Sequence, residues 1–263
     1  VSSEGIKQHR HRFIDFEAVV FTNLSPEHIE SHGGFENYRN EKIKLFKATK
    51  NIHIVNIDDK NAQYFLQLPA KKKYGFTILG GSTSRYGGRT SIVSLKDVQP
   101  LKLQLLGDFN IYNALAAICV GLSQGVSLEA CKRAVEKVKI IPGRMETIIQ
   151  EPFKVVVDYA VTPNALEKAY QALNSKFKIK NSKLICVLGS CGGGRDKWKR
   201  PVLGQIAAQY CQEIILTNED PYDELPEKIL DDIVGGIKNY KLKNINYKLI
   251  LDRKEAIRNA LMS

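Results

Sequence analysis

The sequence predicts an α/β protein with a mostly parallel sheet in its C-terminal half. From about residue 153 onward, short runs of aliphatic and β-branched residues alternate with longer segments of helical period, a pattern typical of βαβ units. The runs are continuously apolar, which indicates strands buried on both faces of the sheet. The predicted strands occupy residues 154–158, 184–188, 213–217 and 247–251, and the predicted helices begin near Pro163, Arg200, Leu225 and Arg253.

The N-terminal half is less regular and predicts a separate domain. Its apolar runs lie at residues 18–21 and 52–55, and helical patterns cover residues 35–49, 110–122 and 128–138. A glycine-studded stretch at residues 80–88 predicts hairpins. Pro142 and Gly143 follow the last of these helices and indicate a hinge, so we expect two domains, at residues 1–140 and 141–263.

Composition narrows the class of ligand. Lys and Arg number 39 against 28 Asp and Glu, and the net charge of +11 attracts anions. The basic residues form no stripe with aromatic residues, which disfavours nucleic acid and favours small phosphorylated molecules. The five cysteines show no CxxC spacing, and the sequence contains neither a long apolar segment nor a signal peptide. We therefore expect a cytoplasmic protein without disulfides, zinc or membrane insertion.

The loop at residues 189–201, GSCGGGRDKWKRP, is a candidate anion site. It follows a predicted strand and precedes a predicted helix, at the sheet edge where ligands of parallel sheets collect. Backbone amides and the side chains of Arg195, Lys197, Lys199 and Arg200 are expected to surround an anion there. The alternative is a flexible basic loop without a ligand.

Several strings, in their order and approximate spacing, resemble the Mur ligase family. They are VSSEGIKQHR (1–10), VVFTNLSPEHIESHG (19–33), YRNEKIKLF (38–46), VNIDD (55–59), GDFNIYNALAA (107–117), IPGRME (141–146) and VVVDYAVTPNALEKA (155–169). Within the family, Gln8-His9-Arg10 and the string EDPYDE are most similar to UDP-N-acetylmuramyl-tripeptide synthetases, which add the third residue of the peptidoglycan stem peptide. The resemblance implies a central ATP-binding domain, truncated at its start, followed by a Rossmann-like C-terminal domain.

The resemblance also implies a reaction. ATP would phosphorylate the carboxylate of UDP-N-acetylmuramoyl-dipeptide, and the amine of an incoming amino acid would attack the acyl-phosphate. ATP and two Mg²⁺ ions are the implied cofactors, because the ions neutralise phosphate charge. We expect a monomer.

Two residues are implied in metal binding. Lys42 lies where the family carries a lysine carbamylated by CO₂, which converts a cation into a carboxylate that can hold the second Mg²⁺. The alternative is an ordinary solvated lysine beside Glu41. His28 matches a metal-associated histidine of the family, and the alternative is a histidine in a surface loop.

Four residues are implied in ATP binding. Asn110 and Asn113 would lie against adenine, although Asn110 could instead cap the helix that begins there. Arg144 and Asp158 match the family's ribose and phosphate contacts.

Six further residues are implied in substrate binding. Ser2, Gln8 and Arg10 would hold the UDP-muramyl substrate, the alternative being a polar N-terminal segment without that role. The region that selects the incoming amino acid contains Arg195, Asp220 and Tyr222.

The sequence departs from the family at two of these places. Diaminopimelate-adding members usually read DNPR where this chain has EDPY at residues 219–222, so Tyr222 replaces the arginine expected to bind a distal carboxylate. Diaminopimelate, lysine or another amino acid therefore stays open. Val161 stands where the family commonly has histidine, which removes a polar group near the nucleotide.

No GKT or GKS string occurs, and such a string supplies the loop that holds ATP phosphates. We therefore expect a piece of a longer ligase, short at both ends and inactive by itself. Two alternatives remain: a non-catalytic module that binds nucleotide or UDP-substrate, and a folylpolyglutamate-type ligase of the same superfamily.

Overall fold

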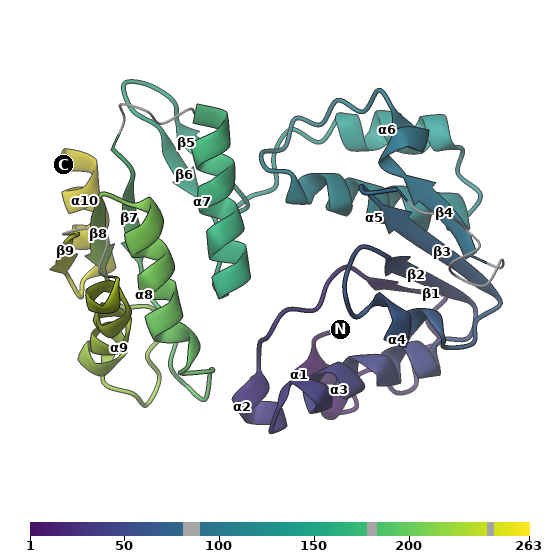
Figure 1. Cartoon of the computed structure of the whole chain (residues 1–263), viewed down its shortest axis with the longest axis horizontal. Helices are drawn as coiled ribbons and strands as arrows, with labels where there is room; N and C mark the ends of the chain where they lie inside the picture. The colour runs from purple at the N-terminus through teal and green to yellow at the C-terminus, as the bar shows by residue number, and fades with distance from the viewer. Residues whose placement is uncertain (81–89, 178–182, 241–244) are drawn as a thin grey trace. The chain divides into compact units, whose positions relative to one another are not determined.

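The computed structural model describes residues 1–80, 90–177, 183–240 and 245–263, which divide into two units (Figure 1). The first unit consists of Val1–Pro26 and His32–Asp158, and the second of Glu27–Ser31 and Tyr159–Ser263. Each unit has hydrophobic clusters of its own. Helices and mostly parallel strands make up both units, which confirms the predicted α/β class. The domain boundary near residue 140 stays a prediction.

The first unit is built on a four-stranded parallel sheet in the order β1-β2-β3-β4. Its strands are Ala18–Phe21, Ile52–Asn56, Lys72–Thr77 and Thr90–Ser94. Ile52 of β2 pairs with Ala18 of β1 and with Lys72 of β3. The hairpins predicted for the glycine-rich stretch fall almost wholly on residues 81–89, outside the described residues. The flanking strands β3 and β4 pair in parallel.

Helices cover both faces of this sheet. They are α1 (Ser3–Lys7), α3 (Phe35–Ala48), α4 (Ala62–Leu66), α5 (Phe109–Ser123) and α6 (Leu128–Glu136). The short α2 (Ile29–His32) belongs to the second unit, except for its last residue. On one face Val55 of β2 packs with Phe46 of α3. On the other, Ile54 packs with Leu115 of α5. Successive residues of β2 thus enter different helical layers, which explains why this strand is buried at every position.

The predicted strand at residues 154–158 is present but pairs differently from our prediction. It is β6 (Val155–Val157), and it pairs antiparallel with β5 (Glu146–Ile149). A parallel partner requires a crossover of about a dozen residues or more, and the segment between these two strands is too short for one. The prediction that this strand belongs to the parallel sheet is therefore wrong for the described pairing.

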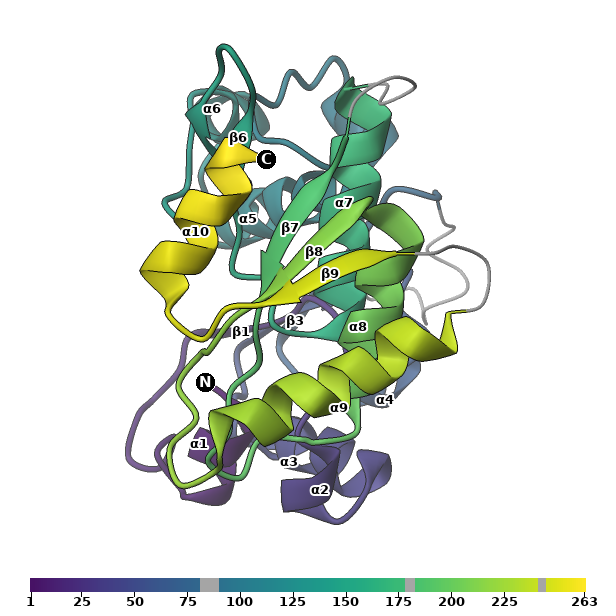
Figure 2. The ribbon, with the colours of Figure 1, turned by 90° about the vertical axis from the view of Figure 1, so that its left-hand side faces the viewer.

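The second unit contains a three-stranded parallel sheet in the order β7-β8-β9, seen side by side in Figure 2. The strands are Ile185–Leu188, Glu213–Leu216 and Asn246–Leu249. The helices are α7 (Pro163–Phe177), α8 (Lys199–Tyr210), α9 (Pro226–Asn239) and α10 (Arg253–Met262). Each helix begins within one residue of its predicted start.

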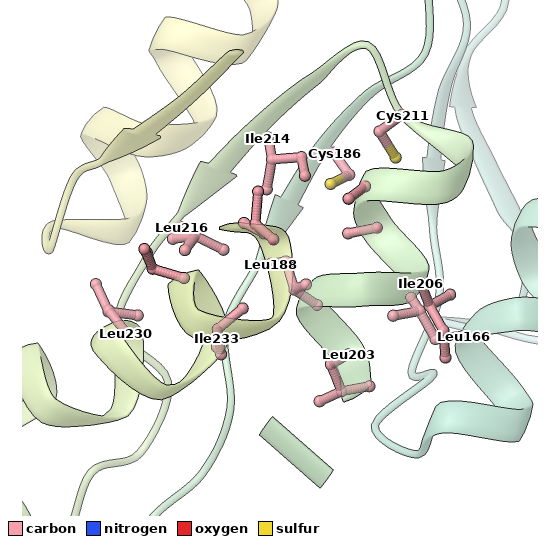
Figure 3. Packing of buried hydrophobic residues seen from close by; sticks show 14 of the residues in the cluster. Leu166, Cys186, Leu188, Leu203, Ile206, Cys211, Ile214, Leu216, Leu230 and Ile233 are labelled. Atoms are coloured by element: carbon pink, nitrogen blue, oxygen red, sulfur yellow. The ribbon is translucent and has the colours of Figure 1, made fainter. Parts of the chain in front are cut away.

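The core of this unit joins three helices to one face of the sheet (Figure 3). Leu188 and Leu216 of the strands pack with Leu166 of α7, Leu203 of α8 and Leu230 of α9. Helices α8 and α9 approach closely because glycines face the contact. A Cβ on Gly204 would overlap the carbonyl oxygen of Ile233, and one on Gly236 would overlap that of Pro201.

Among the described residues, no helix combines the length and the apolar character that crossing a bilayer requires.

Candidate active site

Lys42 lies on α3 in the wall of a cavity of about 70 Å³ within the first unit. Aromatic side chains of Phe21 and Phe46 and the polar residue Asn23 also line this cavity. The ammonium nitrogen of Lys42 is 5.2 Å from the ring centroid of Tyr38, a cation–π distance. A cavity needs only about 10–15 Å³ to hold one water molecule, so the space beside Lys42 is several times that size.

The chain start borders the same cavity. Val1 and Ile6 line it together with Lys42. The Ser2 side chain accepts a hydrogen bond from the Gly5 amide at 3.1 Å and so caps α1. Gln8 and Arg10 follow the helix with exposed side chains. The structure thus places the predicted UDP-substrate residues on one short segment, with Ser2 engaged in helix capping.

Asp58 connects three segments beyond the carboxyl end of β2. Its carboxylate accepts hydrogen bonds from the Thr77 hydroxyl at 2.6 Å, the Ile78 amide at 2.8 Å and the Tyr112 hydroxyl at 3.1 Å. Burial and the adjacent charge of Asp58 raise the pKa of Tyr112 to about 12. This network fixes the start of α5, which carries the two predicted adenine contacts.

Asn110 and Asn113 contact each other on the first turns of α5. The side-chain amide of Asn113 donates to the side-chain oxygen of Asn110 at 2.9 Å. The side-chain amide of Asn110 donates to the backbone carbonyl of Leu106 at 2.6 Å. Asn110 is buried and Asn113 is exposed. The residue that precedes the helix is Asp108, so the alternative that Asn110 caps the helix is wrong.

Arg144 and Asp158 lie at the same end of the β5–β6 hairpin. The Asp158 carboxylate accepts a hydrogen bond from the Met145 amide at 2.7 Å. Loss of water around the carboxyl raises the pKa of Asp158, and the Met145 amide and the Arg144 charge partly offset that rise. Gly143 and Met145 have φ of 68° and 47°, so a turn with left-handed residues brings Arg144 to Asp158.

In the second unit, two loops beyond the carboxyl ends of β7 and β8 meet. The amide of Gly192 donates to the carbonyl of Asp220 at 3.0 Å. The Arg195 guanidinium lies 5.9 Å from the ring centroid of the exposed Tyr222. The structure therefore brings Arg195, Asp220 and Tyr222 together, as expected from the positions of the strand ends.

The segment that carries His28 is bound to the first of these loops. The buried Asp196 accepts hydrogen bonds from the amides of Ile29 at 3.2 Å and Glu30 at 3.0 Å. In return, the Glu30 carboxylate accepts from the amide of Lys197 at 3.0 Å. His28 itself has a φ of 55°, and its imidazole is 3.9 Å from the Glu27 carboxylate. His28 thus belongs to the second unit, whereas Lys42 belongs to the first.

The basic loop differs from the predicted ring of cations around an anion. Arg200 is buried and pairs with Glu224 and Asp232. Lys199 is also buried, and its ammonium donates to the carbonyl of Val161 at 3.2 Å. Lys197 pairs with Glu224 at 3.0 Å. Three of the four cations are therefore engaged in contacts within the protein instead of surrounding an anion.

Sequence reasoning missed the acidic partners in both units. Asp58, Asp196 and Glu224 organise the loops that carry the predicted site residues. The sequence signal for Asp58 was its place after a buried strand in VNIDD, which is typical of a loop-organising carboxylate. Asp196 and Glu224 carry no comparable signal, since their partners are remote in sequence. The described residues contain no group of three or more His, Cys, Asp or Glu arranged to hold a metal ion, and none of the five cysteines forms a disulfide.

Two family models match the chain. Residues 1–121 match the Mur ligase middle domain, and residues 143–263 match the domain described as Mur ligase, glutamate ligase domain.

Curated relatives match over nearly all of this chain. Two proteins called UDP-N-acetylmuramoyl-L-alanyl-D-glutamate–2,6-diaminopimelate ligase, from Syntrophomonas wolfei and Aquifex aeolicus, are each 37% identical to it over 99% of its length. The match covers 55% and 54% of these relatives, so the chain spans about half their length.

Solved structures agree with the family match. A structure of a UDP-N-acetylmuramoyl-L-alanyl-D-glutamate–2,6-diaminopimelate ligase aligns with a TM-score of 0.55 at 30% identity, covering 98% of this chain and 55% of that one. Folylpolyglutamate synthase from Mycobacterium tuberculosis, solved with ADP and AMPPCP, shares the fold with a TM-score of 0.67 at 16% identity, covering 95% and 57%. With a middle domain and a C-terminal domain matched in order along its length, the chain belongs to the Mur ligase family.

Proposed function

We propose that the whole protein is an ATP-dependent ligase that adds an amino acid to UDP-N-acetylmuramoyl-dipeptide in peptidoglycan synthesis. The observation that carries this proposal is the 37% identity, over 99% of the chain, with relatives named as ligases of this substrate. Arg195, Asp220 and Tyr222 of the second unit support it, because they lie on loops beyond the carboxyl ends of the parallel strands β7 and β8, where α/β enzymes bind ligands.

The chemistry proceeds in two steps. ATP, bound with magnesium, supplies the phosphoryl group and the means to neutralise its charge. Transfer to the carboxylate of the dipeptide gives an acyl-phosphate and ADP. The neutral amine of the amino acid then attacks the acyl carbon, phosphate leaves, and the amine loses a proton as the amide forms.

The nucleotide would be held by residues of the first unit. Asn113 presents an exposed amide beside Asn110, a hydrogen-bonding pair suited to a base edge. Arg144 is exposed next to Asp158, so the two offer a cation for phosphate and an acceptor for ribose hydroxyls. We assign these four residues to ATP.

Metal ions would be held by Lys42 and His28. A carbamate forms when neutral Nζ of Lys42 attacks CO₂ and loses a proton, which places a carboxylate in the cavity of the first unit. Oxygen ligands of this kind suit Mg²⁺, and His28 supplies a neutral imidazole. Two ions are proposed.

The two substrates would use separate segments. Ser2, Gln8 and Arg10 are assigned to the UDP-muramyl substrate, and Arg10 provides an exposed guanidinium for an anionic group. Arg195, Asp220 and Tyr222 are assigned to the amino acid. The relatives' names specify diaminopimelate. Tyr222 gives the pocket a phenol in place of a cation, which keeps lysine a candidate beside diaminopimelate. We also propose a cytoplasmic monomer; the lack of a disulfide among the five cysteines is consistent with a reducing compartment.

The test is a ligation assay with the whole protein. UDP-N-acetylmuramoyl-dipeptide, ATP and Mg²⁺ are combined with a panel of amino acids, and ADP release and product mass are followed. We expect one amino acid to give a product heavier than the dipeptide by that residue. Nucleotide binding without amide product from any amino acid would instead identify a non-catalytic binding module.

Residue roles are tested with matched variants. Arg144→Ala should weaken ATP binding about tenfold or more, as expected for loss of a charged hydrogen bond. Arg133→Ala, which changes an exposed arginine on α6, is the control and should leave ATP binding unchanged.

The carbamate is tested by trapping with labelled CO₂. The label should mark Lys42 in the wild type and in Lys44→Arg, a change at an exposed lysine of the same helix. A marked product from Lys42→Arg would contradict the assignment.

A further inference from the structure

Arg200 is a fully buried cation at the base of the two loops that carry the proposed amino-acid site. Its side chain is 1% exposed, in the first turn of α8. The guanidinium binds Glu224 through two hydrogen bonds, of 3.1 and 2.9 Å, and Asp232 through one of 3.0 Å. It also donates to the carbonyl of Cys191 at 3.4 Å. Burial of a charge is costly without partners, so these contacts fix its position.

The two acidic partners differ in what they hold. Asp232 lies on α9, outside the two loops, and its side chain is 47% exposed. Glu224 lies in the loop itself, and its amide donates to the carbonyl of Pro221 at 3.0 Å, closing the turn that contains Tyr222. Glu224 also receives the ammonium of Lys197 at 3.0 Å. The guanidinium therefore reaches one loop through Glu224 and the other through Cys191.

These two loops have little freedom where they meet. A Cβ on Gly192 would overlap the carbonyl of Pro221, and one on Gly193 would lie 2.6 Å from the ring of Tyr222. Tyr222 has a φ of 54°, a conformation that a tyrosine keeps only when its surroundings impose it. The orientation of Tyr222 toward Arg195 thus depends on how the two loops are held.

We propose that Arg200 is a positioning residue for amino-acid selection: through Glu224 and Cys191 it fixes the distance between the loops that carry Arg195 and Tyr222, without contacting the amino acid. This inference rests on the proposed function of these loops as the amino-acid site. The charge-assisted bonds to Arg200 lower the pKa of Glu224, so the carboxylate stays ionised and the pair is maintained at neutral pH.

The kinetic test compares the two acidic partners of Arg200 in the whole protein. Glu224→Gln keeps the shape of the side chain and removes its charge, whereas Asp232→Asn makes the same change on α9. For Glu224→Gln we expect the KM for the amino acid to rise about 10- to 100-fold, as for a small misplacement of binding groups. The KM for ATP should stay within about twofold. Asp232→Asn should leave both KM values within about twofold.

Arg200→Lys adds a second comparison, because lysine retains the charge and loses the two-pronged contact. It should raise the KM for the amino acid, as Glu224→Gln does. The double variant should have a KM no higher than that of either single variant, because all three variants break the same contact between Arg200 and Glu224. A purely structural role would lower the melting temperature of all variants without a selective change in the KM for the amino acid, and that result would overturn the proposal. An equal effect of Asp232→Asn on this KM would overturn it too.

Hydrogen exchange provides a readout that needs no catalysis. The Gly192 amide donates to Asp220 across the two loops. Its exchange should accelerate in Glu224→Gln and remain at the wild-type rate in Asp232→Asn. Unchanged exchange in Glu224→Gln would refute the positioning role. If the wild type forms no amide product, the proposed function fails, and exchange at Gly192 alone decides the role of Arg200.

Discussion

The carboxylates of Asp196 and Glu30 each accept a hydrogen bond from a backbone amide of the other residue's segment. The Asp196 carboxylate accepts a hydrogen bond from the Glu30 amide at 3.0 Å, and the Glu30 carboxylate accepts one from the amide of Lys197 at 3.0 Å. The arrangement works like a capping box, in which two carboxylates each supply the acceptor that a neighbouring amide lacks. Here the two halves lie 166 residues apart in sequence.

Asp196→Ala should release the segment that carries His28. The amides of Ile29 and Glu30 lose their acceptor, and the expected cost is about 1–2 kcal/mol, as for loss of a helix cap. Hydrogen exchange at these two amides should accelerate. The control is Asp231→Ala, which removes an exposed aspartate on α9 and should leave that exchange unchanged. If the amides of Ile29 and Glu30 exchanged as slowly in Asp196→Ala as in the wild type, their hydrogen bonds to Asp196 would be contradicted.

Adjacent glycines of α9 should respond oppositely to alanine. At Gly236 a Cβ would overlap the carbonyl oxygen of Pro201, so Gly236→Ala forces α8 and α9 apart and should lower the free energy of unfolding by about 1–3 kcal/mol. At Gly235 no atom lies within 4 Å of the added Cβ. Gly235→Ala should therefore stabilise the helix by about 0.5–1 kcal/mol. Urea unfolding of the two variants measures both effects, and a loss of stability in Gly235→Ala would show that the position is not open.

His53 should make stability depend on pH. Its Nε2 lies 2.9 Å from the carbonyl of Thr49 and 3.0 Å from that of Phe46, so Nε2 carries the proton. Nδ1 is buried without a hydrogen-bond partner among the described residues. Burial lowers the pKa of His53, opposed in part by the two carbonyl contacts. The unfolded chain therefore binds a proton more readily than the folded one.

The consequence is a loss of stability in acid. Neutral His53 contributes fully to the free energy of unfolding when the pH is above about 6.5, the pKa of a histidine in the unfolded chain. This contribution declines as the pH falls below that value. In urea unfolding, the free energy of unfolding of the wild type should be lower at pH 5.5 than at pH 7.5. This difference should be smaller in His53→Gln. The surface variant His9→Gln should keep the wild-type difference. An identical pH dependence in His53→Gln would rule out this histidine as the cause.

Tyr112→Phe should weaken the start of α5. The phenol loses its 3.1 Å bond to Asp58, and the expected cost is about 1 kcal/mol. Because the pKa of Tyr112 is raised to about 12, the folded protein resists forming the phenolate, and this stabilisation is lost as the pH rises above about 10. In an ultraviolet titration of the folded proteins, the wild type should show a tyrosine that ionises near pH 12, and Tyr112→Phe should lack it. Retention of that transition in Tyr112→Phe would assign it to another tyrosine.

Much of the fold followed from local patterns. Strand β1 lies at the predicted apolar run, and α7 and α10 begin at Pro163 and Arg253 as predicted, because residue period and helix-start signals are local. The partner of β6 could not be predicted in the same way. An apolar run does not show whether its neighbour is a remote strand or one that precedes it by a short turn.

The candidate site was predictable in its location but not in its internal contacts. Strand ends indicated where Arg195 and Tyr222 would meet. The burial of Arg200 was not predictable, since its partners Glu224 and Asp232 lie 24 and 32 residues away and contact it only after α8 and α9 have packed. The roles of the individual site residues in binding and catalysis remain predictions.

The paired aspartates of VNIDD have a further consequence for metal chemistry. Two adjacent carboxylates at the end of a strand are an obvious candidate for a divalent cation. Asp58 already accepts bonds from Thr77, Ile78 and Tyr112, however, and Asp59 accepts from the amides of Leu24 and Asn61. An ion that bound here would share these carboxylates with donors from three segments of the chain. Neutralising Asp58 or Asp59 would therefore disturb the positions of these segments as well as any cation site.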